Sequence, residues 1–188
     1  MKINPMVGFL GMGLLFFDVL LRAEVSPDDF WGMPNPVFLE ADIVGGGPPP
    51  EAVLKRAKEK GFKAVIDLRR PEEGTEAEKE MVQGLGMRYY SVMVTPRTLS
   101  RWQVDDLAEI LKDPANRPAI LHCGSGNRVG ALWALYLYFE RGIEVETALK
   151  TGVEKGLRGQ TLIRITRALM GNQGKPVKET VVGRSEIP

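Results

Sequence analysis

Residues 118–133 read PAILHCGSGNRVGALW, and this stretch decides the fold and indicates where a site lies. An apolar run ends at His122 and Cys123, a glycine-rich turn follows, and a second apolar run begins after Arg128. The pattern predicts a buried strand, a tight loop and a buried helix in direct succession. The first N–H groups of such a helix have no partner within it, and with the helix dipole they favour an anion. We therefore expect the backbone of residues 124–129 to form an anion-binding cradle.

Cys123 and Arg128 are the reactive side chains of this predicted loop. The backbone donors and Arg128 stabilise the thiolate form of Cys123, which is the nucleophilic form. A guanidinium binds phosphate or sulfate through two parallel hydrogen bonds. The alternative is an inert, buried thiol in an ordinary strand-to-helix turn. Neighbouring residues at a strand end point to opposite faces, so His122 is expected to be a structural hydrogen-bonding residue rather than the base for Cys123.

Composition and charge exclude several other classes of function. The chain has 188 residues, which suffices for one well-buried domain. Its 25 basic and 24 acidic residues give a net charge of +1, so nucleic acid and an anionic membrane surface are not expected partners. One cysteine and one histidine exclude an internal disulfide and argue against a zinc cluster. No metal and no organic cofactor is expected.

The N-terminal segment has the pattern of an export signal. Lys2 precedes twelve apolar residues at positions 6–17, and Asp18 follows them. This run is shorter than a membrane span, which takes about 20 residues. The sequence predicts a signal peptide over residues 1–23, cleaved near Ala23, and hence a periplasmic protein. An uncleaved membrane anchor is the main alternative, and it would be the only contact with a membrane.

Strands and helices alternate along the rest of the chain. Thr75 is expected to cap one helix, and Ser100 with Gln103 forms a capping box at another. The alternation predicts a single layered α/β domain over residues 24–171, with a mostly parallel central sheet flanked by helices, followed by a flexible tail over 172–188. The expected strands are 37–44, 62–68, 87–94 and 119–123, and the expected helices are 51–60, 75–86, 101–112, 128–142, 145–157 and 160–171.

The succession of VIDLR, a strand, a capped helix and LHCGSGNRVGALWALY resembles a family of bacterial domains described as beta-lactamase-hydrolase-like and phosphatase-like. That family is similar in fold to the dual-specificity tyrosine phosphatases. The resemblance covers residues 36–158. It implies a tyrosine-phosphatase-like fold, with Cys123 as nucleophile and Arg128 as the clamp on the transition state. It also implies that phosphate binds the backbone of Gly124, Ser125, Gly126 and Asn127, and the free donors of the expected helix start add Val129 to this set.

The sequence departs from the tyrosine phosphatase pattern in the loop itself. Four residues separate Cys123 from Arg128, where those enzymes have five. The shorter loop resembles that of the rhodanese sulfurtransferases, which carry sulfur as a cysteine persulfide. Val129 stands where a Ser or Thr usually stabilises the leaving thiolate, a role that Ser125 is the candidate to take over.

A general acid is also missing from its usual place. Phosphatases of this type carry an Asp after the strand equivalent to 87–94, but residues 95–98 are Thr, Pro, Arg and Thr. The remaining carboxyl candidates are Glu72, Glu73, Asp105 and Asp106. Four arginines are candidates to widen an anionic pocket, although solvation at the surface is the expected state for them: Arg69, Arg70, Arg97 and Arg101.

These observations lead to one main hypothesis and two alternatives. The main hypothesis is a cysteine-dependent hydrolase that acts on a phosphate monoester of a small molecule or a protein, through a cysteinyl-phosphate. The first alternative is a rhodanese-like sulfurtransferase or sulfane-sulfur carrier. The second is a non-catalytic module that binds an anion.

Overall fold

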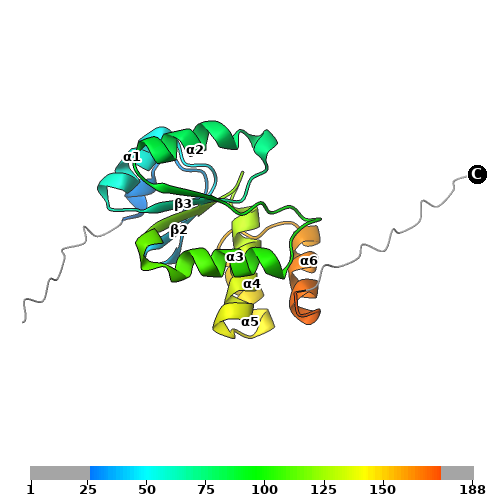
Figure 1. The fold of residues 1–188 in the computed structure, drawn as a ribbon. Coiled ribbons are helices and arrows are strands. Elements are labelled where there is room, and N and C mark those ends of the chain that lie inside the picture. Colours follow the sequence, from blue (N-terminus) through cyan, green and yellow to red (C-terminus); the bar gives the residue numbers. More distant parts are fainter. Residues whose placement is uncertain (1–25, 175–188) are drawn as a thin grey trace, which may run out of the picture.

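A computed structural model describes residues 26–174 of the chain. The predicted signal segment and residues 175–188 of the predicted tail lie outside this range, and the export signal stays a prediction. Within it, a central sheet separates two layers of helices (Figure 1). The strands are β1 (Val37–Glu40), β2 (Ile43–Gly46), β3 (Ala64–Asp67), β4 (Arg88–Ser91) and β5 (Ala119–His122). Their order across the sheet is β1-β2-β5-β3-β4. Strands β2, β5, β3 and β4 run parallel to one another, and β1 pairs antiparallel with β2. The prediction of a layered α/β domain with a mostly parallel sheet is confirmed.

The sheet has one strand more than the sequence predicted. The single strand expected over 37–44 is wrong, because the chain reverses at Ala41 and Asp42 and pairs Phe38 with Val44. This hairpin turn contains no Gly, Pro or Asn, so nothing in its composition marks it beyond Asp42.

Six α-helices cover the two faces of the sheet (Figure 1). Helices α1 (Glu51–Glu59) and α2 (Thr75–Gly84) pack on one face, where Val44, Val65 and Ile120 point. The other face, lined by Ile43, Ile66 and Leu121 among others, packs against the remaining helices. These are α3 (Arg101–Lys112), α4 (Asn127–Arg141), α5 (Val145–Glu154) and α6 (Gln160–Gly171).

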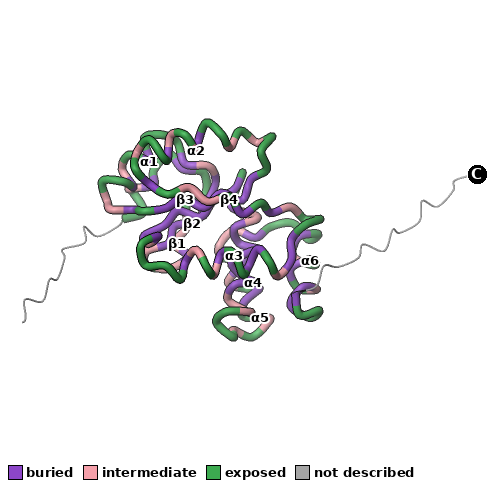
Figure 2. The backbone as a smooth tube through the Cα atoms, in the orientation of Figure 1, coloured by how far each residue is buried: buried purple, intermediate pink, exposed green. Residues whose placement is uncertain are grey.

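Helix α4 is the centre of the larger layer, as the apolar sequence predicted. All its residues from Val129 to Tyr136 are buried (Figure 2), and Trp133 is a core residue that stacks on Tyr136. A Cβ atom added to Gly130 would lie 2.2 Å from the backbone nitrogen of Leu157. The start of α4 is therefore held in backbone contact with the end of α5 and the loop after it, which fixes the loop that precedes α4.

Of the two helix caps that the sequence predicted, the structure contains one and lacks the other. The Ser100 N–H donates to Gln103 Oε1 at 2.8 Å, so the predicted capping box at α3 is present. The prediction that Thr75 caps α2 is wrong, because Thr75 is the first helical residue and the cap position falls on Gly74, with φ of 82°. A 3-10 turn, Pro71–Glu73, leads into this left-handed residue. Among residues 26–174, no helix is long and apolar enough to cross a membrane.

Candidate active site

Cys123 stands at the carboxyl end of the central strand β5, where parallel sheets place their ligands. Its N–H donates to Gly46 O at 3.1 Å, and its Sγ accepts a hydrogen bond from the Gly126 N–H at 3.2 Å. The side chain is 1% exposed. The predicted loop thus exists with a backbone donor aimed at the sulfur.

Arg128 lies in the first turn of α4, and Glu73 holds its guanidinium by a bidentate ion pair. Nη1 is 2.9 Å from Oε1 of Glu73, and Nη2 is 2.6 Å from Oε2. Nη1 also donates to the carbonyls of Leu68 and Val94, at 3.2 and 3.3 Å. Burial opposes the charge, but Glu73 and the nearby Cys123 outweigh it and raise the pKa of Arg128. The guanidinium is therefore charged and fixed beside the sulfur.

Of the four carboxyl groups considered as the general acid, Glu73 is the one that the structure brings to the site, but it does not act there as an acid. Its hydrogen bond with Arg128, helped by the Arg70 backbone, lowers its pKa to about 2. An ionised carboxylate has no proton to give at neutral pH. Glu73 therefore positions Arg128, and the sequence-based suggestion that it is a general acid is not supported by its state.

The other three acid candidates lie away from the loop. Asp105 pairs with Arg101 on the surface of α3, with 2.5 Å between Oδ1 and Nε. Asp106 faces a different hollow, between α3 and β4, and Glu72 is exposed. Burial and the nearby Glu109 and Asp105 raise the pKa of Asp106, but it does not line the pocket at Arg128.

The cradle residues are fixed by contacts from outside the loop. The Asn127 Oδ1 accepts the Arg158 backbone N–H at 2.6 Å. The Ser125 carbonyl accepts from Arg158 Nη2 at 2.6 Å and from Asn35 Nδ2 at 3.2 Å. Gly126 has φ of 85°, a conformation that other residues rarely adopt, and it caps α4. Arg158 and Asn35 are loop partners that no local sequence pattern indicated.

The remaining two predicted cradle residues differ in exposure. Gly124 is exposed, and a Cβ atom there would lie 3.3 Å from Arg128 Nη2. Val129 is fully buried. Its side chain packs closely on Gly45, because a Cβ atom added to Gly45 would lie only 2.9 Å from Val129 Cγ1. The Val129 side chain therefore belongs to the core, and only its backbone belongs to the loop.

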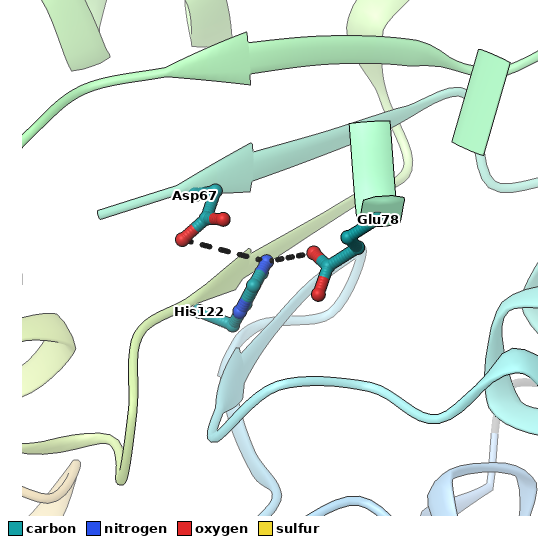
Figure 3. A group of neighbouring side chains, drawn as sticks. All are labelled: Asp67, Glu78 and His122. Atoms are coloured by element: carbon teal, nitrogen blue, oxygen red, sulfur yellow. Dashed lines mark ion pairs between the residues drawn. The ribbon is translucent and has the colours of Figure 1, made fainter. Parts of the chain in front are cut away.

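His122 lies in a buried polar cluster with Asp67 and Glu78 (Figure 3). Cys123 packs in the core on the opposite face of the sheet, since neighbouring strand residues point to opposite faces. The His122 Nε2 lies 2.6 Å from Glu78 Oε1 and 3.9 Å from Asp67 Oδ1. Arg69 Nη2 bridges the two carboxylates at 2.7 Å from each. Burial opposes the charge of Asp67, yet Arg69, His122 and Tyr89 outweigh it, so the pKa of Asp67 is lowered. The cluster anchors the strand ends β3 and β5 directly below the loop.

The same cluster offers three side chains of the kinds that bind metals. Ligand atoms of Asp67, Glu78 and His122 lie within 4.8 Å of one another. The Arg69 guanidinium, however, already supplies a positive charge to both carboxylates at hydrogen-bonding distance. A divalent cation would have to displace or repel this buried guanidinium, so the donor set does not fit a metal site.

A pocket of about 800 Å³ opens above the loop. Its lining comes from Ser125, Asn127 and Arg128, from the β3–α2 and β4–α3 loops, and from the start of α6. The sequence offered four arginines as candidates to widen an anionic pocket, and two of them, Arg70 and Arg97, line this one. The expectation of surface solvation is wrong for Arg69, which is 7% exposed in the polar cluster. The fourth, Arg101, pairs with Asp105 and Glu140 elsewhere.

Comparison with known proteins points to phosphatases. Residues 35–166 match the family described as "DSP-PTPase phosphatase fused to NAD+ Kinase". No curated protein matches the sequence significantly. Among solved structures, a DUF442 protein from Shewanella putrefaciens is similar, with a TM-score of 0.64 and 16% identity over 79% of this chain and 99% of that one.

Two further structures have the same fold. The core catalytic domain of the PP-IP phosphatase Siw14 from S. cerevisiae has a TM-score of 0.59 and 17% identity, over 71% of this chain and 85% of that one. TpbA from P. aeruginosa has a TM-score of 0.61 and 16% identity, over 79% of this chain and 87% of that one.

Proposed function

Since the chain belongs to the family of dual-specificity phosphatase domains described as fused to NAD+ kinase, we propose that it is a phosphatase with Cys123 as its nucleophile. The observation that carries the proposal is the 3.2 Å contact from the Gly126 N–H to the Cys123 sulfur, with the charged Arg128 beside it. A backbone donor and a guanidinium beside a thiolate are the groups that stabilise the charge that develops in phosphoryl transfer.

The reaction has two steps. The thiolate of Cys123 attacks phosphorus in line with the ester bond, so that an S–P bond forms while the P–O bond breaks and the alcohol oxygen takes the electron pair. Water then attacks the cysteinyl-phosphate, which releases inorganic phosphate and restores the thiolate. Arg128 and the loop N–H groups stabilise the charge on the phosphoryl oxygens in both steps.

The substrate is a phosphate monoester with a good leaving group, such as an aryl phosphate on a small molecule or a tyrosine. Within residues 26–174, Glu73 is the one carboxyl that lines the pocket, and its pKa of about 2 keeps it ionised. A leaving oxygen of low basicity departs without a proton, whereas an alkoxide needs one. The state of Glu73 therefore favours aryl over alkyl esters.

One specific observation favours sulfur transfer as a second candidate. The loop has four residues between Cys123 and Arg128, one fewer than in tyrosine phosphatases. A persulfide on Cys123 after treatment with thiosulfate, detected by intact mass, would mark this candidate.

The test is hydrolysis of 4-nitrophenyl phosphate by the full chain under reducing conditions. We expect turnover that Cys123→Ser abolishes and that Arg128→Ala lowers by about 10²–10³-fold. Arg164→Ala is the matched control, because Arg164 is exposed on α6 away from the pocket. Absence of turnover with a reduced thiol would reject the phosphatase. Saturable phosphate binding that survives Cys123→Ser would then select an anion-binding module.

A further inference from the structure

The pocket above the loop is lined mainly by positive charge. Arg70, Arg97, Arg128 and Arg158 line it, and within the described residues Glu73 is the one carboxylate that does so. Glu73 is already shared by Arg128 and Arg70, at 2.6 and 3.4 Å. Arg97 and Arg158 are therefore the two arginines on the pocket wall that do not share the Glu73 carboxylate.

These two arginines on the pocket wall have no carboxylate partner within residues 26–174. Arg97 is exposed in the β4–α3 loop. The hydrogen bond that Arg97 makes within this loop comes from its backbone N–H and not from its guanidinium. Arg158 precedes α6, and its Nη2 donates to the Ser125 carbonyl, which turns the guanidinium toward the loop. Long cationic side chains at such a place bind an anionic group when one is offered.

The start of α6 adds backbone donors to the same wall. Gln160, Thr161 and Leu162 line the pocket and are the first three residues of this twelve-residue helix. No side chain caps their N–H groups, and no acidic residue lies in the first turn. Free N–H groups at a helix start favour an anion. The guanidinium groups and the helix start therefore converge on one wall from two separate elements.

We propose that this wall, formed by Arg97, Arg158 and the start of α6, is a subsite for a second phosphate group of the substrate. The natural substrate is then a small molecule that carries two phosphate groups, one attacked by Cys123 and one held at the wall. This inference rests on the proposed function and narrows its substrate class. The pocket volume of about 800 Å³ accommodates a molecule larger than a single phosphate.

The test measures binding separately from turnover. Calorimetry on the full-length Cys123→Ser chain compares phenyl phosphate with 1,3- and 1,4-phenylene bisphosphate. We expect at least one bisphosphate to bind about tenfold tighter or more, since each charge-assisted contact contributes on that scale. Arg97→Gln in the same background should remove most of this preference. The matched control Arg164→Gln removes an exposed charge on α6 outside the pocket and should keep the preference.

Three outcomes would overturn the inference. Equal binding of mono- and bisphosphates would show that the wall holds no second phosphate. Tighter binding of 3-carboxyphenyl phosphate or of an acidic phosphotyrosine peptide than of either bisphosphate would assign the wall to carboxylates. An unchanged preference in Arg97→Gln would place the second group elsewhere. Turnover of 4-nitrophenyl phosphate by the unmodified chain reports on the phosphatase chemistry in every case, so the two proposals fail separately.

Discussion

Glu73 and Arg128 face each other end-on, with Oε1 and Oε2 of the carboxylate 2.9 and 2.6 Å from Nη1 and Nη2 of the guanidinium. Glu73 comes from the 3-10 turn after β3, and Arg128 from the first turn of α4. The pair therefore ties the anion-binding loop to the neighbouring strand end. Its geometry makes Glu73 a positioning residue for Arg128, the guanidinium that we propose as the clamp on the phosphate.

Glu73→Gln should lower kcat for 4-nitrophenyl phosphate by up to about 10²-fold, because a small displacement of Arg128 has effects of that size. KM should change less, since the phosphate still meets the loop N–H groups. Glu72→Gln is the control, because Glu72 is the exposed neighbour that does not line the pocket. A rise in kcat/KM in Glu73→Gln would contradict the positioning role and mark Glu73 as a competitor of the substrate.

The same ion pair contributes stability that depends on pH. The pKa of Glu73 is lowered from 4.5 to about 2 in the folded chain, so the contribution is fully present above pH 4.5 and is lost as pH falls through 2. The side chain is 26% exposed, so solvent screening keeps the value to about 1–2 kcal/mol. Urea denaturation between pH 7 and 2 should show unmodified protein and Glu73→Gln converging at the acid end. A constant difference would refute the linkage.

The loop could be predicted from the sequence because its parts are contiguous. Cys123 and Arg128 lie within six residues, and the strand-to-helix pattern around them is strong. Glu73 lies 55 residues before Arg128 in a charged loop that resembles solvated surface. Nothing local separates it from Glu72, so only the folded sheet, which brings β3 beside β5, reveals the pair.

The buried cluster below the loop predicts a large effect of a single amide substitution. Glu78 contacts His122 through one oxygen and Arg69 through the other, at 2.6 and 2.7 Å. Glu78→Gln should lower the free energy of unfolding by about 3–5 kcal/mol, because it leaves Arg69 and His122 without a full partner. The midpoint urea concentration of denaturation should therefore be lower for this variant than for the unmodified protein.

Glu76→Gln provides the matched control on the same helix. Glu76 pairs with Lys79 on the surface of α2, with a 73% exposed side chain. Its substitution should change the free energy of unfolding by about 0.5 kcal/mol or less. Similar values for the two variants would show that the buried cluster contributes no more than a surface pair.

This cluster was only partly visible in the sequence. Asp67 ends the apolar strand β3, and a carboxylate at that place signals a buried partner. The partner, Arg69, looked like one of several surface arginines, since its burial depends on Glu78 from the following helix. The β1–β2 hairpin was missed for a similar reason: its turn lacks the residues that usually mark one, and tertiary pairing with β5 sets its register.

Alanine substitutions at two helical glycines should have opposite effects on stability, because one glycine lies at the close contact between α4 and the α5–α6 region and the other has open space around it. A Cβ atom on Gly130 would lie 2.2 Å from Leu157 N and 2.5 Å from Gly152 O, so backbone must move. Gly130→Ala should destabilise the protein by about 3 kcal/mol. Gly171→Ala, at the end of α6 with nothing within 4 Å, should be neutral or stabilise by up to about 1 kcal/mol. Thermal denaturation of both variants checks this, and a tolerated Gly130→Ala would contradict the close packing.

The ionised state of Glu73 predicts how the rate depends on the leaving group. Because the described part of the chain brings no protonated carboxyl to the pocket, the leaving oxygen must carry its own negative charge in the transition state. A series of substituted phenyl phosphates should therefore show kcat/KM falling steeply as the pKa of the phenol rises. Asp106→Asn should leave this dependence unchanged, because Asp106 faces a different hollow between α3 and β4. A flat dependence that becomes steep in Asp106→Asn would make Asp106 the proton donor and would require α3 to approach the loop during turnover.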